Sequence, residues 1–174
     1  MASTSTPSGP AVALRPIQAE DWLLIRRWIT RPDIRRWWGS ASAAEAEMRI
    51  VAETESAIAR IVEVDGRPAG YVHAIDAAHW GSDLPEGMPP GTWDVDIFIA
   101  EPEHRGKGVG ETALSMLADE VFVTTFAAAL SVFVAIANEP AIRAYERAGF
   151  AWTRVWEDPI VGPSWMLLRY RPDM

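Results

Sequence analysis

The residue types best suited to chemistry lie close together, between Asp94 and Gly110. Asp94 and Asp96 are two residues apart in a predicted strand, Thr92 to Ala100, so both side chains are expected on one face of it. Carboxylates in this arrangement can accept a proton from a substrate. Repulsion between them would raise the pKa of one and make it the stronger base.

A glycine-rich loop follows this strand. It runs Arg105–Gly106–Lys107–Gly108–Val109–Gly110 and opens a predicted helix from Gly108 to about Val123. The backbone N–H groups and the positive end of the helix dipole can converge on an anion, to which Arg105 and Lys107 add positive charge. A pyrophosphate suits this geometry. A Walker loop does not fit, because Glu111 stands where that motif requires Lys, and a dinucleotide fingerprint would lie in an early βαβ unit.

The composition limits the class of protein. A chain of 174 residues that is 49% hydrophobic, with nine Trp, is expected to form one globular domain. It has no cysteine, which excludes disulfides, cysteine metal sites and a catalytic thiolate. A net charge of −8 favours a cationic small-molecule substrate and argues against nucleic acid. We expect no metal and no nucleic-acid partner.

Two segments bear on location. Residues 1–10 are rich in Ser, Thr, Pro and Gly and lack the apolar core of a signal peptide, which predicts a disordered leader before a single domain at 11–174. Residues 121–137 are uncharged, but they are short for a membrane span and contain three hydroxyl residues. They predict a helix end, a turn and a buried strand. We expect a cytoplasmic protein with no membrane partner.

The order of the elements predicts a mixed α+β fold, with helices early and strands alternating with helices later. Helices are expected at 19–30, from Pro32 to about 39, and from a capping box at Ser42 and Glu45 to about 56. Asn138 as N-cap, Pro140 in the first turn and Gly149 at C′ bracket another helix. A long loop is expected at 79–91, and strands at 11–17, 58–64, 69–76, 92–100, 130–135, 151–156 and 165–170.

Two motifs together resemble the GNAT superfamily of N-acetyltransferases. The phosphate loop of that family is Gln or Arg, two residues, Gly, one residue, then Gly or Ala, and Arg105, Gly108 and Gly110 match it. Its second signature is an Asn followed by a helix with a Tyr and a terminal Gly-Phe, matched from Asn138 to Phe150. The resemblance implies a GNAT fold, with a central mixed, mostly antiparallel sheet of about six to seven strands flanked by helices, and acetyl-CoA as co-substrate.

The resemblance also implies roles for individual residues. Acetyl transfer to an amine needs a base, and Asp96 occupies the position of the proposed base in related enzymes. Tyr145 matches the hydroxyl that would protonate the leaving thiolate, and without a cysteine the amine would attack the thioester directly. The residues expected to bind the co-substrate are Ile97, Phe98, Ile99, Arg105, Gly106, Lys107, Gly108, Val109, Gly110 and Asn138.

Within the superfamily, the chain is similar to the aminoglycoside 6′-N-acetyltransferases and the acyltransferases of siderophore assembly. The similarity lies in Leu14–Arg15–Pro16, Trp37–Trp38–Gly39, Gly70–Tyr71 and the strand that carries Asp96. The chain departs from the aminoglycoside branch where that branch commonly carries acidic residues, because it has Phe133 to Ala137 and Val161 there.

Four residues are candidates for contact with the acceptor amine: Trp37, Trp38, His73 and Asp94. The two tryptophans could stack on a substrate ring or fill the core. His73 could assist proton transfer, although a lone histidine is more often structural.

Three functions fit the sequence. The first is acetyl transfer to a primary amine of a small cationic molecule, as in aminoglycoside 6′-N-acetylation. The second is acylation of a siderophore hydroxylamine or amine precursor, or of a protein N-terminus. The third is a non-catalytic acyl-CoA-binding module. We expect a monomer or a homodimer.

Overall fold

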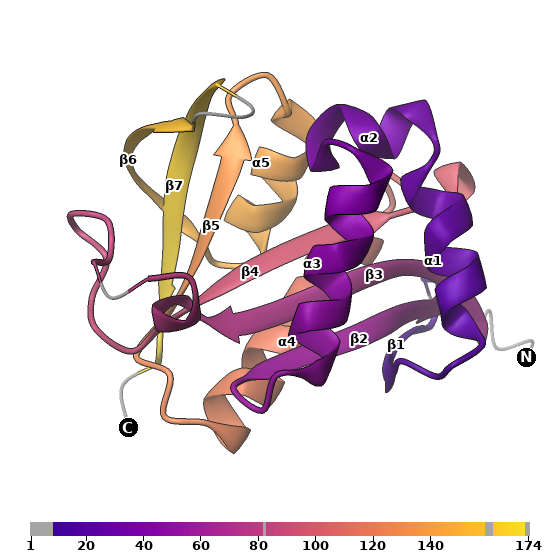
Figure 1. Ribbon diagram of the computed structural model, residues 1–174, viewed down its shortest axis with the longest axis horizontal. Helices are drawn as coiled ribbons and strands as arrows, with labels where there is room; N and C mark the ends of the chain where they lie inside the picture. Colours follow the sequence, from indigo (N-terminus) through magenta and orange to yellow (C-terminus); the bar gives the residue numbers. More distant parts are fainter. Residues whose placement is uncertain (1–8, 82, 159–161, 173–174) are drawn as a thin grey trace, which may run out of the picture.

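A mixed sheet forms the centre of the computed structural model, which describes residues 9–81, 83–158 and 162–172. Within these residues, seven strands form one sheet in the order β1-β2-β3-β4-β5-β7-β6 (Figure 1). Every neighbouring pair is antiparallel except β4 and β5, which confirms the predicted mixed, mostly antiparallel sheet. The strands are β1 (Val12–Pro16), β2 (Ala57–Val64), β3 (Arg67–Asp76), β4 (Thr92–Ile99), β5 (Ala129–Ala135), β6 (Ala151–Asp158) and β7 (Gly162–Tyr170).

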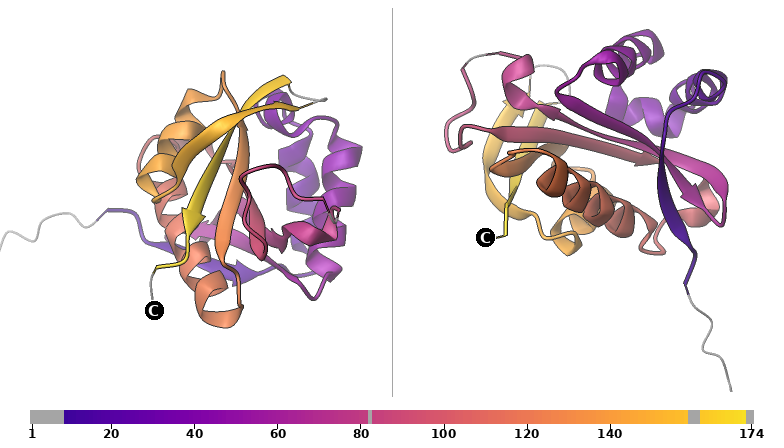
Figure 2. Two further views of the ribbon diagram at one scale, coloured as in Figure 1. Left: turned by 90° about the vertical axis from the view of Figure 1, so that its left-hand side faces the viewer. Right: turned by 90° about the horizontal axis from the view of Figure 1, so that it is seen from below.

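Helices cover both faces of the sheet (Figure 2). The α-helices are α1 (Asp21–Ile29), α2 (Pro32–Trp38), α3 (Ala41–Glu53), α4 (Val109–Thr124) and α5 (Glu139–Arg147), and the short 3₁₀ turns are η1 (Ala77–His79) and η2 (Pro102–His104). Helices α1, α2 and α3 lie on one face, where Ile25, Met48 and Phe98 share an apolar cluster. Helix α4 lies on the other face, where Leu114 and Leu117 join the main core.

The β2–β3 hairpin agrees with its sequence signal. Its turn is Asp65–Gly66, and both residues have positive φ, at 51° and 76°. These angles suit a tight hairpin turn, which places Val64 opposite Arg67. The hairpin supplies β3, which pairs along its length with β4 and so fixes the strand that carries Asp94 and Asp96.

The predicted capping box at Ser42 and Glu45 is wrong. Helix α3 begins one residue before Ser42, and Ser40 is its N-cap, accepting a hydrogen bond of 3.3 Å from the Ala43 N–H. Ser40 has the extended backbone that an N-cap requires, whereas Ser42 is already helical. Glu45 instead forms ion pairs with Arg26 and Arg49. The pair with Arg26 joins α3 to α1, whereas the pair with Arg49 lies within α3.

Strands β4 and β5 pair over a short stretch only. Thr92 lies opposite Ala129 and Asp94 opposite Ser131, and there the parallel pairing ends. Because β4 continues to Ile99 and β5 to Ala135, the two strands run on unpaired with each other beyond this point. This leaves an opening in the middle of the sheet.

The uncharged stretch 121–137 contains the end of α4, a turn and β5, as predicted. In the part of the chain that the structure describes, no helix is both long and apolar enough to cross a membrane. Residues 1–8 of the predicted leader lie outside the described residues, while Gly9 and Pro10 are exposed.

Candidate active site

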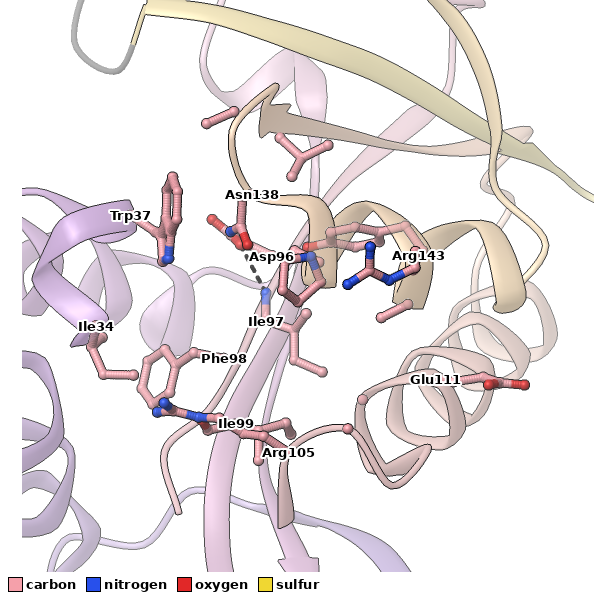
Figure 3. A pocket seen from close by; sticks show the side chains of 18 of the residues that line it. Ile34, Trp37, Asp96, Ile97, Phe98, Ile99, Arg105, Glu111, Asn138 and Arg143 are labelled. Atoms are coloured by element: carbon pink, nitrogen blue, oxygen red, sulfur yellow. Dashed lines mark hydrogen bonds between the residues drawn. The ribbon is translucent and has the colours of Figure 1, made fainter. Parts of the chain in front are cut away.

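A pocket of about 400 Å³ occupies the opening between β4 and β5 (Figure 3). Its walls come from α2, β4, the loop before α4, β5 and α5. Of the residues predicted for the site, those lining it are Trp37, Trp38, Asp96, Ile97, Phe98, Ile99, Arg105, Gly106, Gly108, Gly110, Asn138 and Tyr145. His73, Asp94, Lys107 and Val109 are not among the lining residues.

The loop before α4 has the backbone of an anion cradle. Gly106 and Gly108 have φ of 69° and 79°, a left-handed conformation that favours glycine. Gly108 is the N-cap of α4 and provides no side-chain cap, and the Thr112 N–H bonds back to the Gly108 carbonyl. The N–H groups of the first turn are therefore available to phosphate oxygens. Val109 contributes its backbone, since its side chain is buried in the core.

Arg105 is held by protein groups on the pocket wall. Its guanidinium donates to the carbonyls of Ile99 at 2.7 Å and Ala100 at 3.0 Å, and it forms an ion pair of 2.8 Å with Asp33. The side chain thus ties the loop to the end of β4 and to α2. Its contribution to a bound phosphate is mainly its charge.

Two further arginines on α5 were missed by the sequence reasoning. Arg143 and Arg147 both line the pocket, and their spacing of four residues puts them on one face of the helix. The second motif, from Asn138 to Phe150, contains both arginines at this spacing, so the sequence could have predicted them. They add positive charge to the wall opposite Arg105.

The edge of β4 that faces the opening presents backbone groups. The Ile97 N–H donates 2.8 Å to Oδ1 of Asp96, and the Ile99 carbonyl accepts from Arg105, so neither group is used in the ladder with β3. Successive residues of a strand direct their N–H and carbonyl groups to opposite edges. The backbone groups of Phe98 therefore face β3, and Phe98 lines the pocket with its ring. Since Asp96 and Arg105 engage the Ile97 N–H and the Ile99 carbonyl, the backbone groups left on this edge for a ligand are the Ile97 carbonyl and the Ile99 N–H.

The two aspartates of β4 are held in surroundings that oppose ionisation. Burial raises the pKa of Asp96 well above its ordinary value, and the charges of Glu47 and Asp94 raise it further. Burial also raises the pKa of Asp94 to about 7, although a hydrogen bond of 3.1 Å from Ser131 acts in the opposite direction. A carboxylate with a raised pKa is a better proton acceptor, and Asp96 is the one that lines the pocket.

Tyr145 lies on the buried face of α5, where its ring packs edge-on against Phe150 at 5.5 Å. Burial and the charges of Asp96 and Asp94 raise the pKa of Tyr145 well above its ordinary value, so the hydroxyl keeps its proton and can donate it. Asn138 occupies the N-cap position of α5 as predicted, but its side chain makes no cap hydrogen bond and lines the pocket instead.

The aromatic candidates divide between pocket and core. Trp37 and Trp38 are half-buried and line the pocket, with the Arg36 guanidinium 4.7 Å from the Trp37 ring centroid. His73 is 2% exposed and is not among the lining residues, and its ring centroid is 6.2 Å from that of Trp38. Burial lowers the pKa of His73 to about 4, so it is neutral at pH 7.

Several known proteins are similar to this chain in sequence. A family model described as an acetyltransferase (GNAT) domain matches residues 18–157. The aminoglycoside N(6′)-acetyltransferase type 1 of Klebsiella pneumoniae is 29% identical over 156 residues, which cover 85% of this chain and 78% of that protein. The spermidine N(1)-acetyltransferase of Escherichia coli strain K12 is 27% identical over 150 residues, covering 83% and 75%.

A crystal structure of the aminoglycoside acetyltransferase AAC(6′)-Ib in complex with coenzyme A and kanamycin is similar across almost the whole chain. It superposes with a TM-score of 0.79 at 26% identity and covers 92% of this chain and 95% of that one. The family model matches most of the sequence. The glycine-rich loop and the opening between β4 and β5 are consistent with that match. This chain therefore belongs to the GNAT family of acetyltransferases and is an acyltransferase enzyme.

Proposed function

We propose that this enzyme transfers the acetyl group of acetyl-CoA directly to a primary amine of a small cationic molecule of the aminoglycoside type. The observation that carries the proposal is the position of Asp96, a carboxylate with a raised pKa that lines the pocket beside the cofactor loop. The relatives support the acceptor class, since one is named for an aminoglycoside and another for spermidine, a polyamine.

The pocket suits acetyl-CoA as co-substrate. The first-turn N–H groups of α4 and the glycines at 106 and 108 would hold its pyrophosphate, with Arg105, Arg143 and Arg147 supplying charge. The backbone of Ile97 and Ile99 would pair with its pantetheine arm. Acetyl-CoA supplies an acetyl thioester, whose carbonyl carbon is the electrophile.

Asp96 would prepare the amine for attack. An alkylammonium carries a proton at neutral pH and has no lone pair, so a base must remove that proton before the nitrogen can react. In its deprotonated form, Asp96 first attracts the ammonium and then takes its proton, and its raised pKa favours that transfer. The Ile97 N–H, which bonds Oδ1 of Asp96, holds the carboxylate in place.

Tyr145 would act on the opposite side of the reaction. Its hydroxyl remains protonated because its pKa is raised, so it can donate to the thiolate of coenzyme A as that group leaves. No residue of this chain can hold the acetyl group as a thioester, because the sequence has no cysteine. We therefore propose direct transfer from the co-substrate to the amine.

The test is release of free coenzyme A, followed with a thiol-reactive dye. The absence of cysteine means that the protein itself gives no thiol background. Kanamycin and tobramycin should release coenzyme A above the rate without amine, and mass spectrometry should find one added acetyl group. Release no faster than this background with both drugs would refute the aminoglycoside assignment.

A substrate panel and one variant separate the alternatives. Spermidine, a siderophore-type hydroxylamine and a peptide with a free N-terminus test the second class of acceptor. Asp96→Asn should lower turnover about 100-fold or more while coenzyme A still binds. Asp119→Asn, a change at an exposed position on α4, is the matched control and should leave turnover unchanged. Coenzyme A binding without turnover on any acceptor would instead favour a non-catalytic binding module.

A further inference from the structure

Phe133 on β5 and Asp96 on β4 lie on opposite sides of the opening in the sheet. The last pair of the parallel ladder is Asp94 with Ser131, whose hydroxyl donates a hydrogen bond of 3.1 Å to Oδ1 of Asp94. Side chains two residues apart in a strand share a face, so Asp96 and Phe133, each two residues further along, point to the same face as that pair. Both residues line the pocket. An amine bound at Asp96 therefore has the Phe133 ring as its neighbour across the opening.

Tryptophans of α2 cover the other side of Asp96. Trp38 packs edge-on against Phe98, two residues after Asp96, with ring centroids 5.2 Å apart. It also packs edge-on, at 6.2 Å, against His73, which lies opposite Asp96 in the ladder of β3 and β4. These contacts place the Trp38 indole on the same face of the sheet as the Asp96 side chain. Trp37 lines the pocket from the same helix and lies on its α2 side in Figure 3.

The Phe133 ring is held in place by apolar neighbours. Trp156 on β6 packs against it with ring centroids 5.8 Å apart. Phe133 also packs against the cluster that contains Met166 of β7 and Met88 of the loop before β4. The ring is half-buried, and it lines the pocket with the surface that these neighbours leave uncovered. Trp37, Trp38 and Phe133 thus form a preformed apolar surface around Asp96, here called the aromatic wall.

Asp96 is the carboxylate that this wall surrounds. In the described part of the chain, the lining residues with carboxylates are Asp33, Asp96 and Glu111. Asp33 is already in ion pairs with two arginines. Glu111 lies in the first turn of α4, the helix on the other face of the sheet. Beside the aromatic wall, one carboxylate therefore faces apolar rings, which matches a ligand with one ammonium group attached to an apolar group.

We infer that the enzyme accepts a second class of substrate, primary arylalkylamines, in which a short carbon chain joins the amino group to an aromatic ring. The ammonium group lies at Asp96, and the ring packs between Phe133 and Trp38. The inference rests on the proposed direct transfer from acetyl-CoA and goes beyond its aminoglycoside-type acceptor. An acyl chain of the donor is a poorer occupant of this wall, because the wall surrounds the base that receives the proton of the amine.

The reaction is the same for this acceptor as for any primary amine. The nitrogen forms an amide bond with the acetyl carbon, while the bond from that carbon to the sulfur of coenzyme A breaks. The ammonium group loses two protons in all. Asp96 accepts one and releases it to solvent, and the other balances the protonation of the leaving thiolate.

The test compares 2-phenylethylamine with ethanolamine, two monoamines of equal charge of which only the first carries a ring. Release of coenzyme A should give a kcat/KM about tenfold higher for 2-phenylethylamine, and mass spectrometry should find its N-acetyl product. Phe133→Ser should lower kcat/KM for 2-phenylethylamine about tenfold through KM, with the values for ethanolamine and the KM for acetyl-CoA within twofold of the parent. Phe133→Tyr keeps the ring and should restore turnover of 2-phenylethylamine.

Phe126→Ser is the matched control, because Phe126 lies fully exposed between α4 and β5, and this variant should match the parent. If Phe133→Ser does not fold, Phe133→Leu provides the comparison, since it keeps apolar bulk and loses only the ring. An equal fall for both monoamines in the Phe133 variants would overturn the role of the ring. A raised KM for hexanoyl-CoA with an unchanged KM for 2-phenylethylamine would assign the wall to the donor and overturn the inference.

This test fails separately from that of the proposed function. Turnover of 2-phenylethylamine no faster than that of ethanolamine refutes the inference, whether or not kanamycin is acetylated. Acetylation of 2-phenylethylamine, but of neither kanamycin nor tobramycin, refutes the aminoglycoside assignment and supports the inference.

Discussion

The guanidinium of Arg105 in the cofactor loop contacts the carboxylate of Asp33 on α2 at 2.8 Å. Both residues line the pocket, so the ion pair joins the wall that would hold the co-substrate to the wall that carries Trp37 and Trp38. Asp33 also pairs with Arg31, and Arg31 and Arg105 lower the pKa of Asp33 to about 2. The carboxylate is therefore ionised throughout the pH range of an activity assay.

Asp33→Asn should weaken the binding of acetyl-CoA and lower the stability of the fold only slightly. The pair is about 40% exposed, at 37% for Arg105 and 39% for Asp33, so its loss should lower the free energy of unfolding by less than about 1 kcal/mol. The freed Arg105 would no longer fix the loop against α2, and the KM for acetyl-CoA should rise about threefold, since a contribution of 0.6 kcal/mol corresponds to about that factor.

The matched control is Glu120→Gln, which removes the ion pair of Glu120 with Arg60, away from the pocket. It should lower the unfolding free energy, measured in urea, by a similar amount and leave both KM values unchanged. An equal KM for acetyl-CoA in Asp33→Asn and in the parent would show that the ion pair does not position the loop.

Gly70 on β3 leaves no room for a side chain against β4. A Cβ at this position would lie 2.3 Å from the Phe98 carbonyl oxygen and 3.1 Å from the Ile99 Cα. These are backbone atoms of the strand that forms the pocket wall, and they can move only if β4 moves. Gly70→Ala should therefore lower the free energy of unfolding by about 3 kcal/mol.

Gly81→Ala is the control, because a Cβ there meets nothing within 4 Å, and its effect should stay within about 0.5 kcal/mol. Urea unfolding curves measure both variants. A stability loss below about 1 kcal/mol for Gly70→Ala would mean that the two strands separate easily at this point.

The local parts of the site could be predicted from the sequence. The glycines of the loop at 105–110 and the cap signals of α5 act within a few residues, and the structure places that loop and helix where the motifs predicted them. The fold of the GNAT family followed from these same motifs. Roles for individual site residues, including Asp96 and Tyr145, stay predictions.

The features of the structure that the sequence did not predict depend on contacts between distant segments. Strand β7 enters the sheet between β5 and β6, and β4 parts from β5 after Asp94, because of packing that no local pattern encodes. Asp33 belongs to a helix whose sequence gives only an ordinary amphipathic pattern. Its position on the pocket wall became visible only when α2 was placed on the sheet.

Asp94→Asn should move the pH dependence of activity toward lower pH. The charge of Asp94 raises the pKa of Asp96, so its removal should lower that pKa, and the acidic limb of kcat/KM against pH should shift down. Ser131→Ala should raise the pKa of Asp94 instead, because it removes a hydrogen bond that favours the ionised form. An acidic limb that does not move in Asp94→Asn would show that the charge of Asp94 does not raise the pKa of Asp96.

The same substitution should change stability with a definite sign. The folded-state pKa of Asp94, about 7, is raised above the ordinary Asp value of 3.8, so its protonated form favours folding. That contribution is complete below about pH 4 and is lost as the pH rises to about 7. Asp94→Asn should therefore raise the melting temperature relative to the parent at pH 8, with a smaller increase at pH 5. A larger increase at pH 5 would contradict the raised pKa.

Tyr145→Phe removes one hydroxyl and keeps the ring that packs against Phe150. If the hydroxyl protonates the leaving thiolate, kcat should fall about 100-fold, while the KM for the amine should remain unchanged. The pKa of Tyr145 is raised, so the parent hydroxyl stays protonated and the parent should show no loss of kcat from its ionisation up to pH 9. Tyr170→Phe, at an exposed position on β7, should behave as the parent. Retention of full kcat in Tyr145→Phe would show that the hydroxyl does not protonate the leaving thiolate. Water would then supply that proton.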